Sequence, residues 1–448
     1  MPNRLSGASA LGDNVAGVAF TSLLQTVNDA ADWGRRAERR LEPFYRAPLD
    51  RLVQRPLVDG VQWLLNSGRE PDITLGLAEE RIDPREDEIA ERITILLRDW
   101  VRKHYKPGEA LRAGNTKTYG VVRAELHVLP DLPERLRRGV FAYPGAFRAW
   151  VRFGGPGPLA PPDLDDNGVL SIGVKLLGVP GQKLIDDEST TQDFLGLTSL
   201  VFQSPDVANN VELHEHVAKG TPLFYYVNGS PTRLLEFALQ ALGTRVYASP
   251  LEVQYNSCVP YLLGDGQAIK FRFVPQTTPT PIPLRPGPDY LHEAMVDRLA
   301  DEDVVFDLLV QRQTDPFKMP IENASVIWPD ELSAPVKVAE LRIPAQSFDS
   351  DEQMAFAGNL SMNPWHALPA HRPLGSLNRA RKKMYEALSK DRQRLNSEQR
   401  IEPTGDEVFP GSPALPLSRP APPSTAKLAR PAGRSTRRRA PKRTPAAK

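Results

Sequence analysis

Side chains that could do chemistry come together in one stretch of the chain, LGSLNRARKKMYEALSKDRQRLN, from Leu374 to Asn396. The run has no Pro or Gly after its second residue, so it predicts a helix, with Ser376 as the N-terminal cap. On a helical wheel, Arg381 and Arg392 fall within roughly 40° of Tyr385. The three side chains share the flank of the apolar stripe of this helix.

Two guanidinium groups beside one phenol suggest a particular kind of site. A guanidinium on a buried face needs an anionic partner, or it costs several kcal/mol. The spacing therefore predicts a buried anionic ligand, with the phenol held as phenolate. The alternative is a surface helix whose long side chains run along the edge of the core with their charges in water. The helical wheel alone does not decide between these two hypotheses, the buried anionic ligand and the surface helix.

Composition places the chain among ordinary globular proteins. It has 448 residues, 40% of them hydrophobic and 25% charged, which is enough for two or three average domains or one large domain with extensions. No apolar run approaches the roughly 18 residues of a membrane span. The N-terminus, interrupted by Asp13 and Asn14, is a poor signal peptide. Cys258 is the single cysteine, so an intrachain disulfide is excluded and a cytoplasmic location is expected.

The formal charge of +1 hides an uneven distribution. From Gly411 onward there are ten Lys and Arg and no acid, which leaves −9 for everything before it. This end is rich in Pro, Ser and Ala, so we expect residues 401–448 to be a disordered tail. Such a tail could bind nucleic acid or an anionic surface. It could equally serve only to keep the protein in solution.

The elements that must position the helix are mainly strands. Residues 1–84 are expected to form an N-terminal helical extension, with helical patches at 18–33 and 49–65, and a further helix is expected at 85–105. Another helix is expected at 234–242. Eight β-like runs bounded by turns lie at 121–128, 148–153, 171–178, 193–202, 251–263, 268–274, 304–312 and 336–343. Eight strands favour an α+β fold built on an antiparallel β-barrel, with a β-sandwich as the rival.

The barrel pattern, together with NPWHALPAHRPLGSLNRARKKMYEALSKDRQRLN, resembles the catalase-like haem proteins, which are related to haem catalases and allene oxide synthases. The resemblance covers roughly residues 85 to 400. It implies that haem b is the cofactor and that Tyr385 is the axial, tyrosinate ligand of its iron. It further implies that Arg381 supports Tyr385 and that Arg392 pairs with a haem propionate.

Two more arginines are implied on the propionate side. Arg112 lies in LRAGNTKTYG and Arg152 lies in AWVRF. For Arg152, the alternative is a strand arginine that faces solvent.

On the distal side of the haem, the sequence departs from the family pattern. Asn115 stands where the family has a histidine that carries the peroxide proton, and Thr198 stands where it has an asparagine. An amide can orient peroxide by hydrogen bonds, but it cannot shuttle a proton. Tyr119 could reach this pocket, although a phenol is a weak substitute.

The sequence therefore supports two functions. The first is an oxidoreductase that acts on hydrogen peroxide or an organic hydroperoxide, with weak turnover because of Asn115 and Thr198. The second is a haem-binding sensor or interaction protein without turnover. The sequence predicts no particular oligomeric state.

Overall fold

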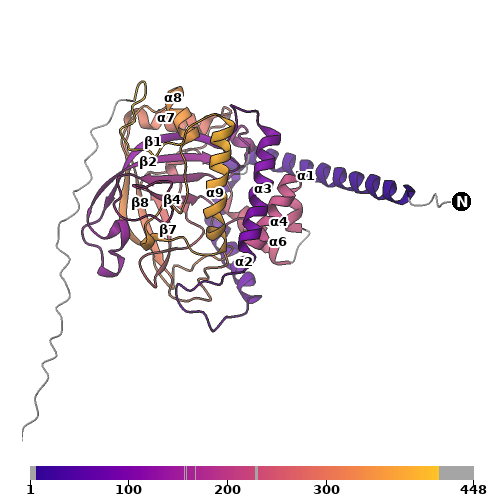
Figure 1. The fold of residues 1–448 in the computed structure, drawn as a ribbon, viewed down its shortest axis with the longest axis horizontal. Helices are drawn as coiled ribbons and strands as arrows, with labels where there is room; N and C mark the ends of the chain where they lie inside the picture. Colours follow the sequence, from indigo (N-terminus) through magenta and orange to yellow (C-terminus); the bar gives the residue numbers. More distant parts are fainter. Residues whose placement is uncertain (1–6, 156, 158, 167, 228–230, 413–448) are drawn as a thin grey trace, which may run out of the picture.

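The backbone of the fold is a long antiparallel pair of strands, β1 (Lys117–Val128) and β2 (Gly145–Gly155), in which Val121 faces Arg152. The computed structural model describes residues 7–412 apart from 156, 158, 167 and 228–230 (Figure 1). A β-bulge in β1 lies between Thr118 and Gly120, so Tyr119 is left without a partner in the ladder.

The remaining strands close this pair into a barrel. They are β3 (Ser171–Leu176), β4 (Gln192–Leu197), β5 (Tyr255–Asn256), β6 (Tyr261–Leu262), β7 (Ala268–Pro275), β8 (Val304–Arg312) and β9 (Val336–Ile343). β9 pairs with β8 and β1, and β5 joins β4 to β7, so eight antiparallel strands form a closed ring, with β6 as an extra short strand on β7. The predicted α+β fold with an eight-stranded barrel is confirmed, and the sandwich alternative is wrong.

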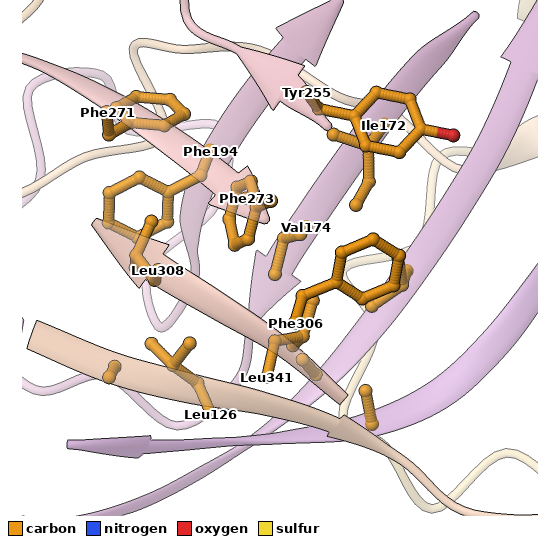
Figure 2. Close-up of a cluster of buried hydrophobic side chains, with 14 of the residues drawn as sticks. Leu126, Ile172, Val174, Phe194, Tyr255, Phe271, Phe273, Phe306, Leu308 and Leu341 are labelled. Atoms are coloured by element: carbon orange, nitrogen blue, oxygen red, sulfur yellow. The ribbon is translucent and has the colours of Figure 1, made fainter. Parts of the chain in front are cut away.

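Side chains fill the inside of the barrel. Along β8, Val304, Phe306, Leu308 and Val310 are buried while the residues between them are partly exposed, as the two-residue period of a strand requires. Figure 2 shows apolar side chains from most of the strands meeting in one cluster. The inside of the barrel is therefore a packed core.

Two predicted strands are shorter than expected. The run 251–263 is divided into β5 and β6, because Cys258 adopts a positive φ of 58° and Pro260 has no N–H to donate to a ladder. The run 193–202 ends as a strand at Leu197. Thr198, which follows, turns back toward the start of β3, where its N–H donates to the Leu170 carbonyl at 2.9 Å.

Helices cover the barrel. α3 (Glu86–His104), α4 (Val207–Ala218) and α9 (Ser376–Leu395) lie side by side in Figure 1. The others are α5 (Pro222–Val227), α6 (Pro231–Gly243), α7 (Tyr290–Asp301) and α8 (Asp351–Asn359). α7 and α8 both pack against β1. Among the described residues, we find no helix that combines the length and the apolar character needed to cross a membrane.

The N-terminal extension is one helical segment where the sequence predicts two patches. α1 (Gly7–Leu49) continues through a π-helical stretch, Asp50–Gln54, into α2 (Arg55–Ser67), which packs on α6. The first turns of α1 project beyond the body of the molecule (Figure 1).

The chain after α9 returns to the barrel. Glu402 accepts hydrogen bonds from the backbone N–H groups of Ser189 and Thr190, at 2.9 and 2.7 Å. Trp150 in β2 donates to Glu407 at 2.9 Å. Residues 402–412 therefore differ from the disorder predicted to begin at 401. The rest of the predicted tail, 413–448, lies outside the described residues.

Candidate functional site

Helix α9 starts at a position that only glycine suits. Gly375 has a φ of 87°, and a Cβ on it would lie 2.7 Å from the carbonyl oxygen of Ile321. The first two N–H groups, of Gly375 and Ser376, donate to Glu80 at 2.9 Å and to Glu322 at 2.8 Å. Carboxylates from two distant segments therefore cap the helix, and the prediction that the Ser376 side chain does so is wrong.

Arg379, in the first turns, holds α9 to α3. Its guanidinium forms ion pairs with Glu80, Glu86 and Glu322. Burial lowers the pKa of Arg379, but the hydrogen bonds to Glu86 and Glu322 outweigh burial and raise it. Further along, Arg102 of α3 pairs with Asp391 of α9 at 2.7 Å. The rotation of α9 about its axis is fixed at both ends.

This rotation turns Tyr385 and Arg381 toward the interior. The guanidinium carbon of Arg381 lies 4.8 Å from the centre of the Phe202 ring and 5.9 Å from that of the Tyr385 ring, and Arg381 donates to Asn378 at 3.0 Å. Tyr385 is half-buried against apolar side chains of α3, α4 and α9, which include Ile93. Within the part of the chain that the structure describes, its hydroxyl group makes no hydrogen bond.

Arg112, Arg152 and Arg392 are brought together from three parts of the chain. Burial and, to a smaller extent, the charge of Arg392 lower the pKa of Arg152 to about 9. Burial also lowers the pKa of Arg392, to about 10, while Glu398 opposes the change. The pKa of Arg112 falls well below its usual value because of burial and the charges of Arg392 and Arg152. Three cations thus share one region that has little negative charge.

Their hydrogen bonds go mainly to backbone carbonyl groups. Arg152, which is 5% exposed, donates to the carbonyl of Asn115 at 2.9 Å and to the Thr118 hydroxyl at 2.6 Å. Arg392 donates to the carbonyl of Asn359 at 3.1 Å, and Arg112 donates to that of Ala357 at 2.8 Å. The Nε atoms of Arg152 and Arg392 are buried without a partner. Since the alternative for Arg152 was a solvent-facing side chain, that alternative is wrong.

Asn115 lies beside these arginines in a strained conformation. Its φ is 52°, a value that non-glycine residues rarely adopt, and its side-chain Oδ1 is buried without a hydrogen-bond partner. Tyr119, on the bulge of β1, is 1% exposed, and its hydroxyl group also lacks a partner. Burial, assisted by the charge of Asp166, raises the pKa of Tyr119 above its usual range, so the phenol keeps its proton.

The hydroxyl group of Thr198 is already engaged. Its Oγ1 accepts the N–H of Leu170 at 2.9 Å. Both Tyr119 and Tyr247 line a small cavity, together with Asp163, Tyr290 and, from α1, Arg39. The N-terminal extension therefore reaches the region beside Tyr119 and Thr198.

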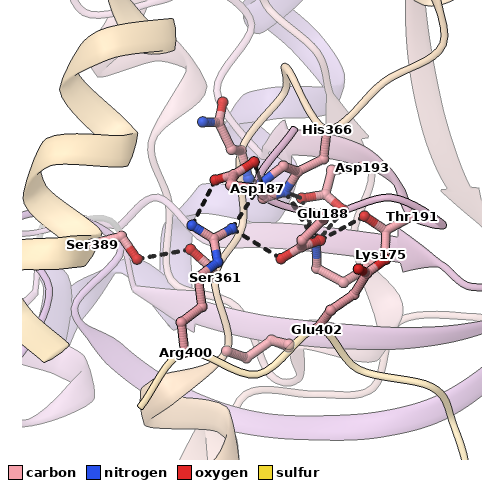
Figure 3. Close-up of polar contacts among 12 residues, drawn as sticks. Lys175, Asp187, Glu188, Thr191, Asp193, Ser361, His366, Ser389, Arg400 and Glu402 are labelled. Atoms are coloured by element: carbon pink, nitrogen blue, oxygen red, sulfur yellow. Dashed lines mark hydrogen bonds and ion pairs between the residues drawn. The ribbon is translucent and has the colours of Figure 1, made fainter. Parts of the chain in front are cut away.

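A second constellation was not anticipated from the sequence. Figure 3 shows Lys175, Glu188, Asp193 and His366 in contact, all with fully buried side chains. Lys175 Nζ lies 2.8 Å from Asp193 and 3.2 Å from His366 Nδ1, and it also pairs with Glu188. Arg400, from the segment after α9, pairs with Asp187 at 2.6 Å and with Glu188 at 3.1 Å.

Glu188, Asp193 and His366 offer three ligand atoms that could hold a metal ion. The Lys175 ammonium group contacts all three side chains, so its positive charge lies where a metal ion would bind. The sequence shows no carboxylate near His366 in the chain, because its acidic neighbours come from β4 and from the segment just before it. His371 satisfies a backbone group in a turn: its Nε2 accepts the N–H of Val140 at 2.9 Å. Burial lowers the pKa of His371 to about 4.

Solved structures with a similar arrangement are catalases. A bacterial catalase matches with a TM-score of 0.50 at 12% identity, over 81% of this chain and 76% of its own. Catalase A from Saccharomyces cerevisiae matches with a TM-score of 0.52 at 11% identity, over 84% of this chain and 82% of its own. No family model and no curated protein matches the sequence. The likeness establishes that the chain has the catalase-like fold.

Proposed function

We propose that this protein binds haem b through Tyr385 and acts slowly on hydrogen peroxide or an organic hydroperoxide. The proposal assigns the haem domain to residues 85–400. It rests on the catalase-like fold and on one observation above all, the cluster of Arg112, Arg152 and Arg392.

The cluster fits the two carboxylates of haem b. Three buried guanidinium groups, in which Arg392 lowers the pKa of both Arg112 and Arg152, are unfavourable without an anion. The Nε atoms of Arg152 and Arg392 are buried without a partner. Two propionate groups would accept hydrogen bonds from these donors and offset the positive charge. On α9, the hydroxyl group of Tyr385 makes no hydrogen bond within the described residues, so its oxygen is available to an iron ion.

Each residue would have a definite role. Tyr385 would bind the iron, and the adjacent Arg381 would favour the phenolate form by its positive charge. Arg112, Arg152 and Arg392 would bind the propionates and set the orientation of the macrocycle. When bound, haem supplies the redox chemistry that the protein side chains lack.

The distal residues would orient peroxide without carrying its proton. The free Oδ1 of Asn115 can accept a hydrogen bond from a peroxide O–H. Tyr119 can donate its hydroxyl proton in a hydrogen bond, but its raised pKa keeps the phenol protonated, so no phenolate is present to take up the peroxide proton. Because general acid–base catalysis contributes about 10² to 10⁴ in rate, we expect turnover to be low.

An absorption spectrum tests this proposal. Purified protein titrated with haem b should bind one equivalent and show the high-spin ferric spectrum of a tyrosinate complex. Tyr385→Phe should remove this spectrum and keep the circular dichroism of the fold, since only one oxygen atom is lost. A wild-type protein that binds no haem, or a variant with the same spectrum, would contradict the assignment.

One observation favours the second candidate, a haem-binding sensor without turnover. The Thr198 hydroxyl already accepts the Leu170 N–H at 2.9 Å, so it is poorly placed to assist a reaction. In this case haem would bind in the same way, and oxygen release and hydroperoxide consumption would both stay at the level of free haem. Matched assays at equal haem content separate the two candidates.

A further inference from the structure

Helix α1 docks on the body of the protein through its polar face. Asn28, Arg39 and Glu42 are each 5% exposed or less. Asn28 accepts the N–H of Leu223 at 3.3 Å, Glu42 accepts that of Val246 at 2.9 Å, and Arg39 donates to the carbonyl of Asp166. Hydrogen bonds to the body, rather than apolar packing, therefore hold this part of the helix.

Large apolar side chains of α1 between residues 22 and 49 consequently face outward. Leu23, Leu41 and Phe44 are 59%, 61% and 67% exposed. On a helical wheel they lie roughly opposite the buried polar residues. The residues on this outward face recur at alternating steps of four and three: Leu23, Val27, Ala30, Gly34, Ala37, Leu41, Phe44 and Pro48. We call these eight residues the α1 seam, and none of them is charged.

A seam of this kind requires a partner. Steps of four and three are the heptad spacing by which one helix packs along another. A single surface helix in a monomer normally turns such a stripe toward its own core. Here the core side is already occupied by the hydrogen bonds of Asn28, Arg39 and Glu42, so the stripe can be covered only from outside.

The order of side chains along the seam matches a reversed copy of itself. Small residues (Ala30, Gly34 and Ala37) lie at the centre, and large ones lie at both ends. If two copies cross at Gly34 and run antiparallel, Ala30 faces Ala37 and Val27 faces Leu41. Small side chains then allow close approach at the centre, and large ones fill the widening space on either side. A Cβ on Gly34 would meet no atom within 4 Å, so that face is open.

Charge supports the same orientation. Between residues 22 and 33 the charged residues are Asp29 and Asp32, whereas residues 34–48 carry five Arg and two Glu. Antiparallel pairing brings the acidic half of one helix against the basic half of the other, and places Asp29 near Arg40 of the second copy. In a parallel pair, the acidic halves of the two helices would lie side by side, and so would the basic halves, so like charges would repel.

We propose that the protein forms a dimer in which two α1 helices pair antiparallel along the α1 seam, about a two-fold axis at Gly34. This interaction is independent of haem. It leaves the barrel, α3 and α9 outside the contact.

Cysteine cross-linking tests the geometry. The native Cys258 is buried, so it should not react. Gly34→Cys should form an intermolecular disulfide with itself under mild oxidation, because residue 34 lies on the two-fold axis. Leu23→Cys alone should not, whereas mixing Leu23→Cys with Phe44→Cys should give the disulfide. Self-linking of Leu23→Cys as efficient as that of Gly34→Cys would indicate a parallel pair and overturn the geometry.

Sedimentation of the full chain tests the dimer itself. Leu41→Glu should raise the dimer Kd at least about 100-fold, because it introduces two charges into the seam. The matched control is Ile73→Glu, which changes another exposed apolar side chain, 93% exposed and outside the seam. Asp29→Arg should weaken the dimer, and the double change Asp29→Arg/Arg40→Asp should restore it.

Two results would overturn the proposal. One is a wild-type protein that stays monomeric up to about 100 μM, well above the Kd of a specific pair. The other is a monomeric wild-type protein that binds vesicles of anionic phospholipid and loses this binding in the Leu41→Glu variant. That result would mean that a lipid surface, and not a second copy of the chain, covers the α1 seam.

Discussion

Arg392 lies close enough to Arg152 to add to the effect of burial in lowering the pKa of that guanidinium to about 9. The two residues come from α9 and β2, so the fold itself brings like charges together. Such an arrangement is unfavourable in the protein alone and favourable once an anion is bound. The arrangement should therefore lower the stability of the haem-free protein while it raises the affinity for an anionic ligand, and both quantities can be measured.

Arg392→Met should therefore have opposite effects on the two quantities. The free energy of unfolding of haem-free protein should rise by about 1 kcal/mol, because a buried charge is replaced by an apolar side chain of similar length. Affinity for haem should fall at least about tenfold, because a charged hydrogen bond to a propionate is lost. Denaturant unfolding and haem titration give the two values. The exposed neighbour Arg394→Met is the control, and a destabilised Arg392→Met with normal haem affinity would rule out the anion site.

Removal of the charge beside the ligand should weaken the iron complex. Arg381→Leu keeps an apolar contact with Phe202 but removes the cation next to the Tyr385 ring. We expect haem to dissociate faster, by about tenfold, and the tyrosinate bands to shift. Transfer of haem to an excess of apomyoglobin measures the rate. Lys383→Leu, on the exposed face of the same helix, should leave the rate unchanged.

Asn115→His tests the distal position. With histidine at this position, a proton carrier is restored, so oxygen release from hydrogen peroxide should increase by at least about tenfold over wild type at equal haem content. Recovery should remain partial because Thr198 still lacks an amide donor. Rapid oxygen release by the wild-type protein would show that another group carries the proton. No activity in either protein, with haem bound, would favour the sensor.

The buried charge network predicts a dependence of stability on pH. Against burial and the charge of Lys175, the neighbouring Asp193 and the hydrogen bonds to Asp187 and Asp193 raise the pKa of His366 above its usual 6.5. A raised pKa means that the stabilising contribution is complete below about 6.5 and is lost as the pH rises through the higher, folded-state value. His366→Gln should thus be less stable than wild type near pH 6, and the difference should shrink toward pH 9.

Denaturant unfolding at several pH values checks this difference. Glu236, whose pKa burial raises to about 7, titrates in the same range in both proteins, so the comparison must be between variant and wild type. The exposed His104→Gln is the control. A difference that is constant from pH 6 to pH 9 would show that His366 is not charged in the folded protein.

The basic tail should matter for anionic polymers and not for haem. Deletion of residues 413–448 removes all ten of its Lys and Arg. The haem spectrum should be unchanged, while any binding of DNA in about 50 mM salt should disappear. If the full chain does not bind DNA under that condition, the tail has no such role.

The barrel could be predicted from the sequence because most of its strands have a local pattern of their own. The runs at 268–274, 304–312 and 336–343 carry the two-residue alternation of a half-buried strand, and the structure places strands there within one residue. The turn that divides 251–263 was not predicted: Pro260 is a signal against a continuous strand, but the positive φ of Cys258, a residue with no strong turn preference, gives no sign in the sequence.

Local periodicity could predict which residues share one face of a helix, but not the contacts that join separate segments. Arg381, Tyr385 and Arg392 lie on one face by simple periodicity. The contacts of Lys175 with Glu188 and His366 join three separate segments, so no local pattern signals them. The capping of α9 by Glu80 and Glu322 was missed for the same reason, because helix caps are normally sought in the adjacent sequence.

The short strand β5 makes one side of the barrel much weaker than the rest. Its ladder with β4 consists of the single pair Leu197 and Asn256, and its ladder with β7 has two pairs, whereas β1 and β2 are joined along their whole length. Local opening begins where the fewest hydrogen bonds must break. Backbone amides around Asn256 should therefore exchange with solvent deuterium far faster than those of β1. Because Thr198 directly follows Leu197, transient opening of the β4–β5 ladder would occur beside the candidate site. The remaining strands of the barrel would stay paired.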